Sequence, residues 1–141
     1  MFYKNILVPI DKSQQSNIAF QKALKIANRQ TQLHLVHVIN IQAFDNLDVE
    51  DDEIIEKISN NVRKKLKKMV AIAKKCNIYT DYSIEYGSPK LLISKDIPQN
   101  KHIDLIILGA TSMHKIKQLF LGSTTEYVIQ HAPCDVLVVH K

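Results

Sequence analysis

Apolar residues along the chain gather in short runs that alternate with longer amphipathic segments. Residues 5–10, 33–39 and 104–109 are dominated by branched apolar side chains and predict buried β-strands. Residues 134–139 form a similar run near the end of the chain. Residues 78–86 instead alternate apolar and polar positions, which predicts a strand with one more polar face, near the edge of a sheet.

Segments with helical spacing separate these strands. Apolar residues at three- and four-residue steps predict helices over about residues 14–30 and 50–76. Gly87-Ser88-Pro89 is expected to stop a strand and start a helix, because serine caps helices and proline suits the first helical position. Pro98 is then expected to end or kink that helix. A last helix is predicted over about residues 123–131.

The alternation of strand and helix predicts an α/β fold. We expect one domain over residues 1–141, built as a doubly wound, five-stranded parallel sheet with helices on both faces. Ligands of such sheets bind beyond the carboxyl ends of the strands, where the winding reverses. Asp11, Val38 and Gly109 lie at such ends and are expected on one rim of the sheet.

Composition and charge change this picture little. A hydrophobic content of 45% suits one globular domain, and the first apolar run is too short for a membrane span or a secretory signal, so we expect a cytoplasmic protein. The net charge of +5 lies mostly in residues 63–76, where lysines form the solvated face of an amphipathic helix, so nucleic-acid binding is not favoured. Cys76 and Cys134 lack disulfide-scaffold or zinc-site spacing and are interpreted as structural thiols.

Two of the three glycines, Gly109 and Gly122, bracket a long segment, and three hydroxyl residues follow Gly122. A helix N-terminus preceded by glycine presents free N–H groups and the positive end of a dipole, which together hold phosphate. Gly122, Ser123 and Thr124 are therefore a candidate anion site. Ser123 and Glu126 also have the spacing of a capping box, in which the helix satisfies its own donors, so both interpretations stay open here.

These motifs in combination resemble the universal stress protein family, close to its small, single-domain, UspA-like members. The likeness spans essentially the whole chain through ILVPIDKS, LHLVHVI, EYGSPKLLI, DLIILGATS, GSTTEYV and HAPCDVLVVHK. It implies the adenine nucleotide alpha hydrolase-like form of the fold. Members that bind ATP carry G-x2-G-x9-G-[S/T], and here Gly109, Ser112 and Gly122-Ser123 keep that spacing with serine in place of the middle glycine.

The resemblance implies ATP as the ligand, with Mg²⁺ arriving alongside it. Asp11 would hydrogen-bond the ribose hydroxyls, and Gly109 would back the ribose. Pro9 and Val38 would line the adenine pocket, Val38 through its backbone. The phosphates would be surrounded by Ser112, Gly122, Ser123 and Thr124.

Serine at position 112 is expected to preserve binding. If the position requires a positive φ, serine costs roughly 1 kcal/mol relative to glycine, while its hydroxyl can donate to a phosphate. No catalytic residue and no protein-made metal site emerge from the sequence, and the P-loop lysine is absent. We therefore expect at most slow ATP hydrolysis.

The last strand predicts an oligomer. It contains no internal proline or lysine to protect an exposed edge, and the family resemblance implies a homodimer paired through it. The central residues of that interface would be Val136, Leu137, Val138 and Val139. The alternative is a dimeric, UspA-like interaction or protective protein that binds no nucleotide.

Overall fold

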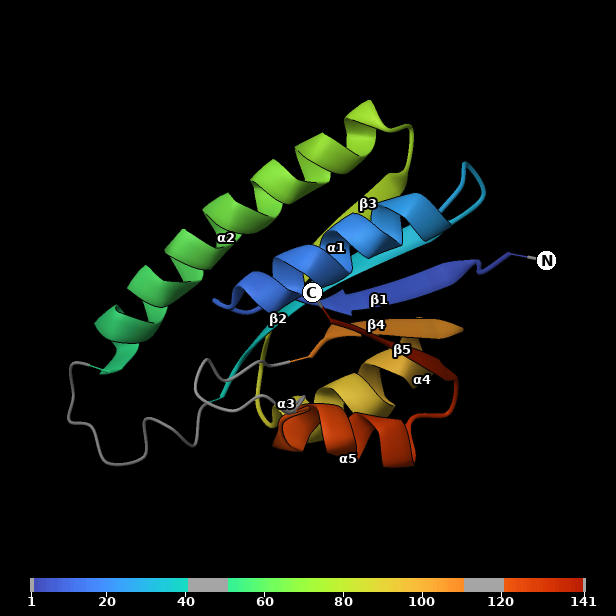
Figure 1. Ribbon diagram of the computed structural model, residues 1–141. Coiled ribbons are helices and arrows are strands. Elements are labelled where there is room, and N and C mark those ends of the chain that lie inside the picture. Colours follow the sequence, from blue (N-terminus) through green and yellow to red (C-terminus); the bar gives the residue numbers. More distant parts are fainter. Residues whose placement is uncertain (1, 41–50, 111–120, 141) are drawn as a thin grey trace.

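The computed structural model describes residues 2–40, 51–110 and 121–140, and it has a parallel sheet with helices on both faces (Figure 1). The strands are β1 (Asn5–Pro9), β2 (Gln32–Ile39), β3 (Tyr79–Tyr86), β4 (Leu105–Gly109) and β5 (Asp135–Val139). Their order is β3-β2-β1-β4-β5, with each neighbouring pair parallel. The predicted doubly wound, five-stranded fold is confirmed, with the winding reversing between β1 and β4.

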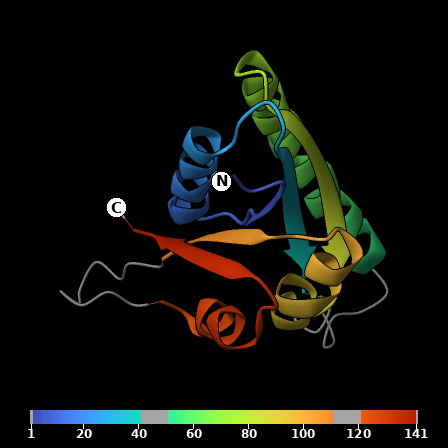
Figure 2. The ribbon, with the colours of Figure 1, turned by 90° about the vertical axis from the view of Figure 1, so that its right-hand side faces the viewer.

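Helices cover the two faces of the sheet in separate groups (Figure 2). They are α1 (Gln14–Ile26), α2 (Asp51–Lys75), α3 (Pro89–Leu91), the π-helical turn η2 (Leu92–Asp96), α4 (Ile97–Asn100) and α5 (Ser123–His131). Alternate residues of β1 supply the two cores. Ile6 and Val8 pack with α1 and α2, whereas Leu7 packs with η2, α4 and α5. Because helices cover both faces of the sheet, the inner strands β2, β1 and β4 consist of nearly continuous apolar residues.

Helix α1 ends at Ile26, four residues earlier than predicted. The amide of Ala27 closes the last turn by donating to the carbonyl of Ala23 at 2.8 Å. The Asn28 side chain then accepts from the amide of Gln30 at 2.8 Å, which forms a turn that leads the chain into β2. The local hydrogen bonds of asparagine therefore compete with continuation of the helix.

The segment that begins at Ser88 shows how the chain accommodates Pro98. The predicted cap is confirmed, because the Ser88 hydroxyl accepts from the amide of Leu91 at 3.5 Å. The helix does not end at Pro98, however, since α4 continues to Asn100. The turn before the proline is π-helical, with the Ile97 amide bonded to the Leu92 carbonyl, and this wider turn makes room for the proline ring.

Strands β3 and β5 form the two edges of the sheet. The polar alternation in β3 predicted an edge position, and β5 was expected to be an edge strand without protecting residues. Burial, followed by the charges of Asp135 and Asp104, raises the pKa of the Cys134 thiol to about 11, so this group stays protonated at neutral pH, as a structural thiol should. Cys76 is exposed just after α2 and is not a core residue.

None of the described helices combines the length and apolarity needed to cross a membrane.

Candidate functional site

A cavity of about 280 Å³ lies beyond the carboxyl ends of β1, β2 and β4, against the start of α5. Every described residue of the predicted site lines it, namely Pro9, Asp11, Val38, Gly109, Gly122, Ser123 and Thr124. Ser112, the remaining predicted site residue, lies outside the described residues. The single rim expected from the strand ends is therefore present, and the head of α5 closes it on one side.

One part of the cavity lining is formed by buried apolar side chains. Alongside the predicted Pro9 and Val38, the lining includes Val36, Ile93 and Leu108. Val36 could have been found from the sequence, because residues two apart on a strand share a face. Ile93 could not, since its place depends on how the π-helical turn packs against the sheet. A flat apolar ring would fit this part of the cavity.

Asp11 lies in the turn between β1 and α1. One oxygen of its carboxylate, Oδ1, accepts hydrogen bonds from the amide and the hydroxyl of Ser13, at 2.7 Å for the amide. Ser13 in turn caps α1 by accepting from the amide of Ser16. Among the described residues, none donates a hydrogen bond to the second oxygen, Oδ2. Asp11 is therefore anchored through Oδ1 within the turn, and it lines the cavity.

The head of α5 does not form the capping box, which was one of the two interpretations of Ser123 and Glu126. Gly122, with φ 86° and ψ 155°, is the N-cap, and no side chain caps the helix. Ser123 is the first helical residue instead, and the amide of Glu126 bonds to the main-chain oxygen of Gly122 at 3.0 Å. The helix thus begins one residue later than the capping box would require, and no side chain among the described residues accepts from its first-turn amides. Such amides and the helix dipole attract an anion.

Gly109 is constrained by helix α1. A Cβ atom at this position would collide with the main-chain carbonyl group of Gln15, and the Cβ of Gln15 would be 2.8 Å away. The space that the sequence suggested for a ribose is, on this side of the glycine, filled by the backbone of α1. Gly109 also lines the cavity, so the residue allows close packing of α1 directly beside the site.

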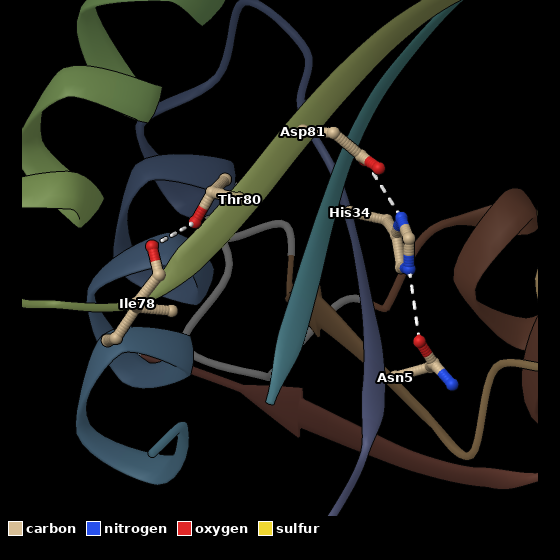
Figure 3. A network of polar contacts seen from close by, with 5 residues as sticks. All are labelled: Asn5, His34, Ile78, Thr80 and Asp81. Atoms are coloured by element: carbon tan, nitrogen blue, oxygen red, sulfur yellow. Dashed lines mark hydrogen bonds and ion pairs between the residues drawn. The ribbon is translucent and has the colours of Figure 1, made fainter. Parts of the chain in front are cut away.

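A second set of polar contacts joins side chains of β1, β2 and β3, namely Asn5, His34 and Asp81 (Figure 3). The His34 ring lies between two side chains from neighbouring strands, with Nδ1 2.8 Å from an oxygen of Asp81 and Nε2 3.3 Å from Oδ1 of Asn5. Burial raises the pKa of Asp81, but the hydrogen bond and charge of His34, together with the charge of Lys101, lower it more, to below its usual value. Among the described residues, no three His, Cys, Asp or Glu side chains are grouped to hold a metal ion.

Comparisons with known proteins point to one family. A family model described as "Universal stress protein family" matches residues 2–140. The chain is 35% identical over 139 residues to a putative universal stress protein of Staphylococcus epidermidis, covering 97% of this chain and 84% of that protein.

Two solved structures have the same fold. The universal stress protein UspA from Lactobacillus plantarum is 31% identical, with a TM-score of 0.86 over 99% of both chains. A universal stress protein from Archaeoglobus fulgidus in complex with dAMP is 21% identical, with a TM-score of 0.67 over 98% of both chains.

Proposed function

The chain belongs to the universal stress protein family, and from this premise we propose that it binds ATP and acts as a dimeric stress-response module in the cytoplasm. The observation that carries the proposal is the cavity at the switch point of the sheet, which combines an apolar floor, a carboxylate oxygen and the uncapped head of α5. The dAMP complex of the Archaeoglobus relative supports an adenine nucleotide as the ligand class.

Each part of the cavity suits one part of ATP. The adenine ring would lie on the apolar floor beside Val38, and Oδ2 of Asp11 would accept hydrogen bonds from the ribose hydroxyls. The phosphates would meet the first-turn amides of α5 together with the hydroxyls of Ser123 and Thr124. Mg²⁺ would be held by the phosphates. The chain's own groups therefore bind and orient the nucleotide, and we propose at most slow hydrolysis.

Isothermal titration on nucleotide-stripped protein tests this function. ATP, AMP and cyclic AMP are titrated separately, and we expect saturable binding with ATP preferred over AMP by at least about threefold, because added phosphate charge interacts with the helix N-terminus. Adenine absorbance should also be released when the unstripped protein is denatured. If neither binding nor released adenine is found, the non-nucleotide, dimeric interaction protein becomes the favoured alternative.

We also propose that β5 pairs with β5 of a second copy. Val136, Leu137 and Val138 are only partly buried on this edge strand, and an apolar edge without such a partner invites uncontrolled association. Val138→Asp is expected to convert the dimer to a monomer, because the exchange places like charges in an apolar interface. Light scattering measures the mass. Ser83→Asp, on the opposite edge strand, is the matched control and should remain dimeric. A wild-type monomer, or a dimeric Val138→Asp variant, would contradict this arrangement.

A further inference from the structure

Two consecutive main-chain carbonyl groups just after β1 are held by side chains from two different elements. The carbonyl of Ile10 lies 2.7 Å from Nδ1 of His37 in β2, and the carbonyl of Asp11 accepts from Nζ of Lys65 in α2 at 2.8 Å. The amide of Ile10 donates to the carbonyl of Val36 at 2.7 Å. The backbone that carries Asp11 is thus fixed from two sides before α1 begins.

This fixation restricts the turn that carries the Asp11 carboxylate. Oδ1 is bound by Ser13, and no donor among the described residues bonds to Oδ2, so the hydroxyl groups of the proposed ligand would meet Oδ2. The Asp11 carbonyl is held by Lys65 and also accepts from the Ser16 hydroxyl at 3.3 Å, and Ser13 holds Oδ1, so the turn that carries the carboxylate is fixed beside the cavity that Asp11 lines. A hydrogen-bond acceptor that is held in place in this way loses less conformational entropy when it binds a hydroxyl group.

Lys65 differs from the other lysines of its helix. Lys64, Lys67 and Lys68 are exposed, as expected of a solvated basic face, whereas Lys65 is partly buried. Its side chain reaches a residue 54 positions earlier in the chain. The neighbouring Leu66 belongs to the core between α2 and the sheet, which fixes the side of the helix from which Lys65 extends.

We propose that Lys65 is a positioning residue for ribose recognition, holding the Asp11 turn so that the site selects nucleotides with ribose hydroxyls over those that lack them. This inference rests on the proposed adenine-nucleotide function. Lys65 acts through Asp11 and does not itself contact the ligand. It gives α2 a role at the site that the amphipathic pattern of the helix does not reveal.

The test compares ATP with 2′,3′-dideoxy-ATP by titration calorimetry. Hydrogen bonds to a charged acceptor are expected to give the wild-type protein at least about tenfold preference for ATP. In Lys65→Met, which keeps the aliphatic length but loses the donor, the preference should fall to about threefold or less while dideoxy-ATP binds within about twofold of wild type. Lys64→Met, on the exposed face, is the matched control and should keep the full preference.

Lys65→Arg adds a rescue measurement, since arginine keeps a cationic donor and should retain most of the preference. If Lys65→Met lowers the affinities for ATP and dideoxy-ATP equally, Lys65 has a general electrostatic or structural role, and the inference is overturned. Unchanged preference would overturn it as well. These results differ from failure of the proposed function, in which wild-type protein binds neither nucleotide and both conclusions fall together.

Discussion

Gly109→Ala is expected to lower the free energy of unfolding by about 3 kcal/mol, at the upper end of the cost of inserting a methyl group into a packed core. The added Cβ would meet the main-chain carbonyl of Gln15 in α1. A flexible side chain could move aside, but this backbone is fixed within a helix. Because the φ angle of Gly109 is not in the left-handed region, the cost is steric. Urea denaturation monitored by circular dichroism measures the change.

The double variant Gln15→Ala/Gly109→Ala is the control for this explanation. The colliding carbonyl belongs to the main chain, so removing the outer atoms of the Gln15 side chain should not restore stability. A substitution of glycine by alanine at an unstrained, open position stabilises by about 0.4–1 kcal/mol through the unfolded chain. If Gly109→Ala is as stable as wild type, or more so, α1 does not pack as described.

Gly122→Ala is expected to weaken ATP binding at least about tenfold and to destabilise the fold by about 1–3 kcal/mol. At φ 86° and ψ 155°, Gly122 occupies a region that is essentially restricted to glycine. Relief of that strain by alanine would turn the first amides of α5 away from the cavity. Adenosine has no phosphate, so its affinity should change by about twofold or less. Calorimetry with ATP and adenosine measures the two effects separately.

Ser123→Ala is the matched control for Gly122→Ala. It removes one hydroxyl next to the glycine but keeps the backbone geometry, so we expect at most about a threefold loss of ATP affinity. Equal losses for ATP and adenosine in Gly122→Ala would mean that the whole cavity is disturbed. Unchanged ATP affinity would show that the head of α5 does not hold phosphate.

Much of the fold could be predicted because its signals are local. The apolar runs that become β1, β2 and β4 need both faces covered, and the polar alternation in β3 correctly placed that strand at an edge. The sequence was less decisive where neighbouring interactions choose between close alternatives. The turn at Asn28 ends α1 earlier than predicted, a π-helical turn precedes Pro98 without ending the helix there, and Gly122 caps α5, where the sequence left a Ser123 cap open.

The candidate site was predictable to the extent that it depends on strand ends. The carboxyl ends of parallel strands share one rim, so Asp11, Val38 and Gly109 could be grouped from the sequence alone. The contact between Lys65 and Asp11 could not, because it depends on how far α2 lies from the β1–α1 turn. The reason for glycine at position 109, at the end of β4, could not be inferred from the sequence either, because it is a close contact with the backbone of α1.

The central place of β1 imposes an order on folding. Ile6 and Leu7 are synthesised well before their partners on one side, Leu105 and Ile106. The amides of Lys4 and Asn5 likewise bond to the carboxylate of Asp104. Such distant pairings are slow to form and leave an apolar strand half unpaired meanwhile. On the ribosome, the first strand must wait for roughly a hundred further residues before the sheet can close around it.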